Sequence, residues 1–219
     1  SRITGETVYG DAIERVAFNG AQGARKKDER AIAYLSSPNQ VFATSSSSYA
    51  DGHHQVYAPC VPVSCCPVMS VRILPEFICS TVLTDVTDDS AGDCAGGPAG
   101  EKDGDLYFAT YAPVKISHGR IRIEVVTLYP FRDCIDFRFS LAEPLEKTLH
   151  FRIPAWCDNA QFMINGTAQP ESCAPAAYAS IRRQWADGDL ITLRLPMQVR
   201  IGRLNDADRS RLYPIMIEY

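Results

Sequence analysis

The stretch CIDFRFSL, residues 134–141, decides the fold, because its apolar and polar side chains alternate along the chain. Ile135, Phe137, Phe139 and Leu141 fall on one face of an extended chain, and the residues between them fall on the other. Alternation with a period of two over this length predicts a β-strand that buries one face.

Five further stretches after residue 120 read as strands. They are IRIEVVTL (121–128), TLHFRI (148–153), AQFMING (160–166), YASIRRQW (178–185) and DLITLRL (189–195). Asn165-Gly166 and Asp187-Gly188 are typical of the turns that join such strands. Six short strands at this spacing predict an antiparallel β-sandwich.

Two stretches before residue 85 have the period of helices instead. TVYGDAIERVAFNG (7–20) carries its apolar residues on one helical face, and Asn19-Gly20 is expected to end that helix. PVMSVRILPEFICSTVL (67–83) repeats apolar residues in the same way; Pro67 suits a first turn and Pro75 is expected to kink the helix. Two helices cannot bury both of their apolar faces alone, so the chain is expected to be a piece of a longer protein.

Residues 85–105, DVTDDSAGDCAGGPAGEKDGD, offer almost no apolar surface and are expected to form a flexible linker. The expected organisation is a helical part over residues 1–84, this linker, and a β-sandwich over residues 106–219. The last stretch, YPIMIEY (213–219), is an apolar strand with no closing turn, so the sandwich is expected to be truncated.

Composition excludes several classes of partner. The formal net charge is −4, and acidic and basic residues are mixed along the chain, which argues against nucleic acid and against an anionic membrane surface. No apolar run approaches the roughly 20 residues of a membrane span, and the first residues are not a signal sequence. The absence of an export signal slightly favours a cytoplasmic location and leaves the compartment open.

The stretch YAPCVPVSCCPVMS (57–70) holds three of the eight cysteines, with Cys65 and Cys66 side by side and Cys60 five residues before. The residues alone leave four readings open: a metal or catalytic site, packing in the core, a strained vicinal disulfide, and disulfides to Cys60 or Cys79. The other cysteines in helical or strand-like stretches are expected to be buried and inert, namely Cys79, Cys134, Cys157 and Cys173.

Several other residues have side chains that occur in functional sites. The pair His53-His54 follows an Asp-Gly turn and is a candidate for substrate or metal binding, although paired histidines in a turn are more often plain surface. Structural roles are expected for His118, His150, Trp156 and Trp185. Asn165-Gly166-Thr167 matches a glycosylation acceptor, but a hairpin turn explains it equally well.

Seven stretches, taken in order, resemble glycoside hydrolase family 127, the β-L-arabinofuranosidase-like proteins. They are TGETVYGDAIERVAFNG, SCCP followed by a helix, LYFATY, TLYPF, LHFRIPAWC, MING and IRRQWADGDLITLRLPMQVR. The resemblance covers nearly the whole chain. It implies the terminal helices of an (α/α)₆ barrel followed by an antiparallel β-sandwich, and it implies that the N-terminal barrel portion of the same protein is missing here.

The resemblance also implies a chemistry. Cys65 matches the family's nucleophile and a zinc ligand, and Cys66 matches a second zinc ligand, so Zn²⁺ is the implied cofactor and a carbohydrate the implied substrate. The family's Glu-x-Cys ligands and its acid/base glutamate are expected before Ser1, because no glutamate among Glu6, Glu14 and Glu29 has a cysteine two residues on. The expected function is a retaining hydrolase of β-L-arabinofuranosides or related plant sugars.

Two rival functions remain open at this point. A non-catalytic carbohydrate-binding or scaffolding sandwich would have lost the upstream site. A thiol redox protein would cycle Cys65 and Cys66, although the chain lacks a Cys-x-x-Cys on a thioredoxin-like pattern.

Overall fold

The computed structural model of the protein describes residues 4–34, 56–57, 65–85, 104–170, 173–203 and 215–218, and at 65–68, 203 and 215–218 it describes the backbone alone. The chain divides into two compact units. The first contains Ser1–Ile13 and Ile78–Pro196, and the second contains Glu14–Phe77 and Met197–Tyr219. The boundary at Ile13/Glu14 falls inside α1 (Val8–Arg15) and the one at Phe77/Ile78 falls inside α2 (Cys65–Cys79), so each of these two helices contributes to both units.

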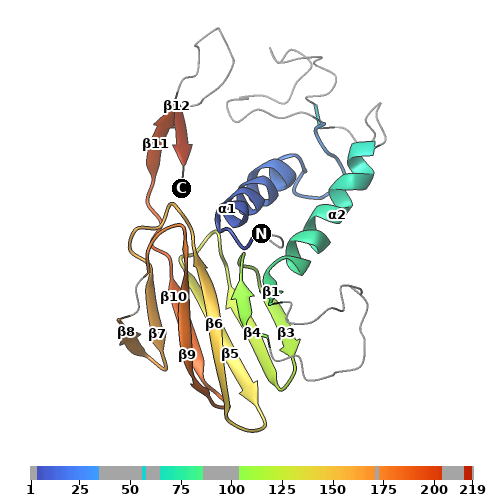
Figure 1. The fold of residues 1–219 in the computed structure, drawn as a ribbon. Coiled ribbons are helices and arrows are strands. Elements are labelled where there is room, and N and C mark those ends of the chain that lie inside the picture. Colours follow the sequence, from blue (N-terminus) through green and yellow to red (C-terminus); the bar gives the residue numbers. More distant parts are fainter. Residues whose placement is uncertain are drawn as a thin grey trace. The chain divides into compact units, whose positions relative to one another are not determined.

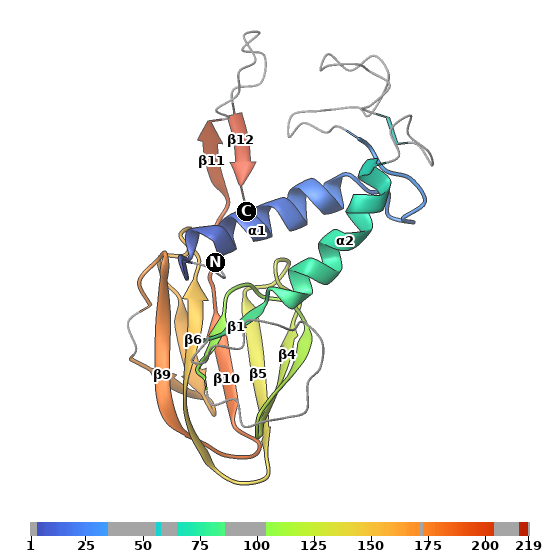
Figure 2. The ribbon, with the colours of Figure 1, turned by 45° about the vertical axis from the view of Figure 1, so that its right-hand side comes forward.

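The first unit is a β-sandwich of two sheets (Figure 1; Figure 2). In the four-stranded sheet the order is β1 (Val82–Thr84), β2 (Leu106–Phe108), β6 (Leu145–Ile153) and β9 (Ala177–Trp185). In the six-stranded sheet the order is β3 (Val114–His118), β4 (Ile121–Thr127), β5 (Cys134–Leu141), β10 (Leu190–Arg194), β7 (Gln161–Ile164) and β8 (Thr167–Gln169). All six strands predicted from alternation are present, and the prediction of a sandwich is confirmed.

One pairing differs from the antiparallel sandwich that the sequence predicts. Strand β2 pairs with β6 in parallel, with Leu106 opposite Leu149 and Phe108 opposite Phe151. The alternation of apolar residues cannot reveal this direction, because β2 has three residues and both of its apolar side chains would point inward in either orientation.

Aromatic rings from both sheets fill the core between them. Phe108 and Phe151 stack with centroids 4.9 Å apart, and Phe137 of the opposite sheet meets Phe151 edge-on at the same separation. These rings are almost entirely removed from water, and each contributes about 1.5–3 kcal/mol through burial of its apolar surface. The residues that alternate inward in β5 and β10 belong to this core, as the sequence predicts.

The first helix is longer than the sequence predicts. Helix α1 (Val8–Arg15) continues without a break into a π-helix, η1 (Val16–Ala21), so the expected stop at Asn19-Gly20 is wrong. A π-helix bonds residue i to residue i+5 and widens the turn, which lets a helix accommodate a residue that would end an ordinary α-helix. Such segments often occur near functional sites.

The second helix, α2 (Cys65–Cys79), runs through Pro75 and ends earlier than predicted, because Val82 already belongs to β1. Within the second unit Phe77 of α2 packs edge-on against Phe18 of η1, with centroids 5.3 Å apart. The C-terminal stretch forms a strand as expected: β12 (Ile215–Glu218) pairs antiparallel with β11 (Arg200–Arg203).

The part of the chain that the structure describes holds two α-helices and one π-helix, and no helical barrel is among these residues. None of the described helices is long and apolar enough to cross a membrane.

Candidate functional site

Cys65 and Cys66 are the first two residues of α2, and Pro67 follows them in the first turn. Proline is favoured at the start of a helix because the N–H it lacks would have no partner there. The N-terminal end of a helix carries unpaired N–H groups and a partial positive charge, which together favour an anion. The backbone therefore places both cysteines at the N-terminal end of α2.

Contacts inside the second unit fix the rest of α2. The Arg25 guanidinium donates a hydrogen bond to the backbone carbonyl of Ser70. Arg72 and Glu76, one turn apart on the exposed side of the helix, form an ion pair at 2.8 Å. These contacts, with the Phe18–Phe77 ring pair, hold the helix at whose start the cysteines lie.

The other residues proposed for this site lie outside the described part of the chain. His53, His54 and Cys60 are among them, so their candidacy as substrate or metal ligands stays a prediction. Among the side chains that the structure does describe, no three His, Cys, Asp or Glu residues gather in a way that could hold a metal ion. For zinc, the adjacent thiols of Cys65 and Cys66 fit as two of the four ligands that a tetrahedral site needs.

The expectation that four other cysteines are buried holds in part. Cys157 is fully buried, whereas Cys79 and Cys134 are exposed and Cys173 is half-buried. Cys134 begins β5, and its thiol lies 3.5 Å from Asp133 Oδ1. Burial of the sulfur and the neighbouring carboxylate raise the pKa of this thiol, so it is a poor nucleophile despite its exposure.

Trp185 and Asn165 are structural, as the sequence analysis favoured. Trp185 is fully buried, stacks on Phe139 at 4.6 Å, and donates its Nε1–H to the carbonyl of Lys147. Asn165 has a φ of 51° in the turn between β7 and β8, and its side-chain amide donates to Asp189 Oδ1 at 2.8 Å. The hairpin turn explains the Asn-Gly pair, and the side chain that a glycan would need is engaged with Asp189 and the backbone N–H of Leu190.

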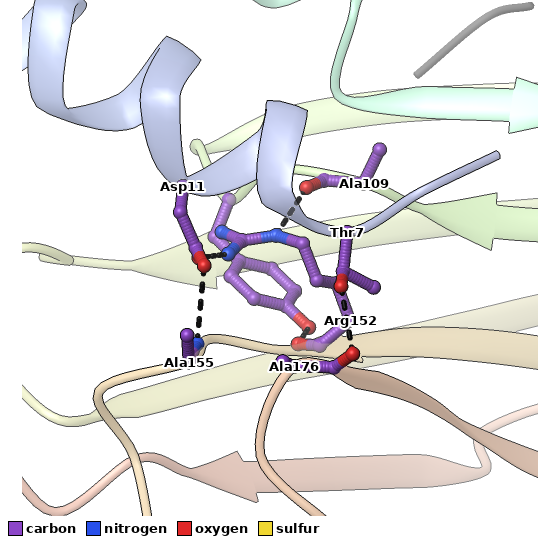
Figure 3. Close-up of polar contacts among 7 residues, drawn as sticks. Thr7, Asp11, Ala109, Arg152, Ala155 and Ala176 are labelled. Atoms are coloured by element: carbon purple, nitrogen blue, oxygen red, sulfur yellow. Dashed lines mark hydrogen bonds and ion pairs between the residues drawn. The ribbon is translucent and has the colours of Figure 1, made fainter. Parts of the chain in front are cut away.

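A buried arginine joins the start of α1 to the sandwich (Figure 3). Arg152 of β6 is entirely buried; its Nε donates to the carbonyl of Ala109 and its Nη1 forms an ion pair with Asp11 of α1. The second carboxylate oxygen of Asp11 accepts from the backbone N–H of Ala155 at 3.2 Å. The Tyr111 hydroxyl donates to the carbonyl of Arg152, and its ring lies below the guanidinium.

Thr7 adds a further link, because its hydroxyl donates to the carbonyl of Ala176 at 2.8 Å. These contacts form what we call the arginine clamp, made of Thr7, Asp11, Ala109, Tyr111, Arg152, Ala155 and Ala176 (Figure 3). Since the guanidinium faces protein atoms on two sides, the clamp holds the helix in place and is not shaped to receive a substrate.

Comparison with known proteins identifies the sandwich. Residues 105–197 match the sequence model described as beta-L-arabinofuranosidase, GH127 middle domain. The sandwich is therefore similar to the middle domain of glycoside hydrolase family 127. A search of curated proteins gives no match.

Solved structures of family 127 and related enzymes share the fold. A GH127 beta-L-arabinofuranosidase from Geobacillus stearothermophilus T6 aligns with a TM-score of 0.75 at 23% identity, covering 99% of this chain and 32% of its own. A protein named glycoside hydrolase aligns with a TM-score of 0.75 at 17% identity, covering 99% and 33%. The GH127 beta-arabinofuranosidase BT3674 aligns with a TM-score of 0.69 at 20% identity, covering 98% and 32%. The chain thus spans about a third of the length of the structures it matches.

The arginine clamp is the part of the structure that reasoning from the sequence missed. Arg152 lies in the stretch LHFRIPAWC and Asp11 in TGETVYGDAIERVAFNG, both of which support the family resemblance, yet their partnership spans 141 positions. No local pattern indicates it, because Phe151, Arg152 and Ile153 alternate as in any half-buried strand, in which the arginine is expected to face water.

Proposed function

We propose that this chain is part of a retaining, zinc-dependent glycoside hydrolase in which Cys65 is the nucleophile and Cys66 a zinc ligand. The substrates would be β-L-arabinofuranosides or related plant-derived sugars. The helices α1, η1 and α2 would be the last helices of an (α/α)₆ barrel whose N-terminal portion is the missing partner of this chain. The observation that carries the proposal is the position of Cys65 and Cys66 at the first two residues of α2, in a chain whose sandwich matches the GH127 middle domain.

The chemistry requires a thiolate at neutral pH. A free cysteine, with a pKa of about 8.5, is mostly protonated there, and both a helix N-terminus and a bound metal lower that value. Zinc, when bound, would keep the coordinated thiols deprotonated and would weaken their intrinsic nucleophilicity, so the sulfur of Cys65 would have to loosen as it attacks. Two adjacent cysteines bring two ligands to one ion at little cost in loop-closure entropy.

The proposed reaction has two displacements. The Cys65 sulfur attacks the anomeric carbon, forming a C–S bond as the glycosidic C–O bond breaks, and the leaving oxygen takes a proton from a general acid outside this chain. Water, deprotonated by the same group acting as a base, then attacks the anomeric carbon, and Cys65 leaves as a thiolate. Two inversions at one carbon give net retention, as in hydrolases that use two carboxylates.

The test is hydrolysis of an aryl β-L-arabinofuranoside by the full-length protein and its Cys65→Ser variant. We expect turnover to be abolished in the variant while its thermal unfolding stays unchanged, because a serine hydroxyl has a far higher pKa than a thiol. Mass spectrometry of the wild-type protein trapped during turnover should find one sugar on the peptide that contains Cys65. Undiminished activity in Cys65→Ser, or a sugar on a carboxylate, would refute the proposal.

A further inference from the structure

The outer face of the four-stranded sheet carries a group of polar and aromatic side chains. In β6, Leu149 and Phe151 point into the core, so His150 between them points outward. Tyr107 of β2 lies opposite His150 on one side, and Ser180 of β9 lies opposite it on the other. Together with three neighbours on the same face these residues form what we call the tyrosine patch: Asp85, Asp105, Tyr107, His150, Tyr178 and Ser180.

The rings of the tyrosine patch have a definite arrangement. Tyr107 stacks on the imidazole of His150, with centroids 4.1 Å apart and planes 7° from parallel. Tyr178 meets Tyr107 at 5.6 Å with its plane turned by 88°. Both tyrosines are half-buried, so part of each ring remains in contact with water. Three rings that fix one another in this way form a rigid aromatic surface on an element of the scaffold.

Hydrogen-bonding groups border these rings. The Tyr107 hydroxyl donates to Asp85 Oδ2 at 3.2 Å, and burial, followed by the charge of Asp85, raises the pKa of Tyr107 so that it stays a donor. His150 Nδ1 is 2.8 Å from the Ser180 hydroxyl, and its Nε2 is 3.5 Å from Asp105 Oδ2. Within the described residues, His150 Nε2 has no hydrogen-bond partner at ordinary length. The two aspartates are exposed or partly exposed and can accept further hydrogen bonds.

Asp105, His150 and Ser180 are the residue types of a hydrolytic triad, but their surroundings do not support that reaction. Ser180 lies in the middle of β9, where backbone N–H groups lie in the plane of the sheet and bond to β6. Among the described residues of β6 and β9, no pair of N–H donors is therefore directed at the space above the serine, where an oxyanion would form. The group is better suited to holding a ligand than to cleaving one.

We propose that the tyrosine patch binds a neutral, arabinose-containing oligosaccharide, a role that the proposed function does not assign to it. Sugars present a face of C–H bonds that packs on aromatic rings and hydroxyl groups that donate to carboxylates, and the patch offers both kinds of contact on one rigid surface. Asp85 and Asp105 place two carboxylates beside the rings, and Arg182 on the same face of β9 is paired with Glu146, which disfavours anionic glycans. The choice of arabinose as the sugar rests on the proposed function, whereas the inference that the patch is a sugar-binding site rests on its own side chains.

The test is affinity electrophoresis of the 219-residue chain in native gels that contain soluble arabinan, with dextran and polygalacturonate gels for comparison. We expect arabinan alone to retard the chain. Tyr178→Ala should weaken binding about tenfold through loss of the aromatic contact, and Asp85→Asn, an exposed change that spares the core, should weaken it measurably. The matched control is Phe131→Ala, because Phe131 is an aromatic residue that is 80% exposed and lies outside the patch.

The outcomes separate this site from the proposed catalytic one. Cys65→Ser in the 219-residue chain should bind arabinan as the wild type does, and hydrolysis is measured separately in the full-length protein, so the patch and the cysteine mechanism are tested independently. No retardation of the wild type, retardation by polygalacturonate instead, or equal retardation of the wild type, Tyr178→Ala and Asp85→Asn would overturn the inference.

Discussion

Gly10 of α1 lies directly against Arg152 of β6. A Cβ atom at Gly10 would be 2.6 Å from Cδ and Nε of Arg152 and 2.7 Å from the carbonyl oxygen of Ala109, closer than such atoms can approach. Arg152 is fully buried, so it has no room to withdraw. The absence of a side chain at Gly10 is therefore what allows the helix to approach the sheet closely enough for Asp11 to reach the guanidinium.

Gly10→Ala is accordingly expected to destabilise the protein by about 1–3 kcal/mol, the usual cost of forcing an atom into a packed interior. Chemical denaturation measures it. The control is Gly23→Ala, since a Cβ at Gly23 would meet no atom within 4 Å and its backbone is helical. There the change should be neutral or stabilising by up to about 1 kcal/mol. Equal effects at both glycines would contradict the close contact described here.

Asp11→Ala should cost more than the loss of an ordinary ion pair. Arg152 has no exposed side-chain surface, so removing Asp11 leaves a charge buried without its counterion, and such losses amount to about 3–5 kcal/mol. The exposed pair Arg72–Glu76 is the matched comparison, because Glu76→Ala should cost roughly 0.5 kcal/mol or less. Denaturation curves of both variants decide it, and a cost below that of Glu76→Ala would rule out the clamp as a stabilising element.

The ion pair between Asp133 and Arg194 is expected to make the folding stability depend on pH in the acidic range only. The hydrogen bond from Arg194 Nε to Asp133 Oδ2, at 2.9 Å, lowers the pKa of Asp133 in the folded state. A carboxyl group whose folded pKa lies below its unfolded pKa contributes stability above the unfolded value of about 3.9 and loses it as the pH falls through the folded value. The wild type and Arg194→Ala should therefore differ in stability at neutral pH and converge towards about pH 2.

Carbon-detected NMR titration of the Asp133 carboxyl group tests the cause directly. Its pKa should rise towards the ordinary value in Arg194→Ala and stay unchanged in Arg182→Ala, which breaks the exposed pair with Glu146 elsewhere on the sandwich. If the pKa of Asp133 is unchanged in Arg194→Ala, a group other than Arg194 lowers it.

The sandwich could be predicted from the sequence because its signals, the alternation within each strand and the residues of each turn, lie in short stretches of the chain. Ile135, Phe137 and Phe139 are buried and alternate with polar residues at the period of a strand, which a helix cannot bury on one face. Asn165 and Gly166 both have the positive φ angles that an Asn-Gly turn favours. The parallel pairing of β2 with β6 could not be predicted, because a strand of three residues carries no signal of its direction and the two strands are distant in the sequence.

The arginine clamp and the continuation of α1 were beyond local reasoning for different reasons. Arg152 reads as an outward polar residue until Asp11, far away in the sequence, is known to neutralise it. Gly20 reads as a helix stop because propensity favours one, yet the π-helical turn and the packing of Phe18 on Phe77 override that preference. The position of Cys65 and Cys66 at the start of α2 follows from Pro67 and the apolar period behind it, so this part of the candidate site was accessible to the sequence.

Cys66→Ser should fail differently from Cys65→Ser in the full-length protein, because in the proposed function Cys66 holds the metal and does not bond to sugar. Replacing one thiolate ligand by a hydroxyl lowers zinc affinity. The fraction of protein that holds zinc, and with it the activity, then rises as the free zinc concentration is raised. We therefore expect Cys66→Ser to regain part of its hydrolysis of an aryl β-L-arabinofuranoside as zinc is raised, while Cys65→Ser regains none. Zinc content after dialysis, measured beside the rates, supplies the second readout. If zinc restores both variants equally, or neither, the division of roles between the two cysteines is wrong.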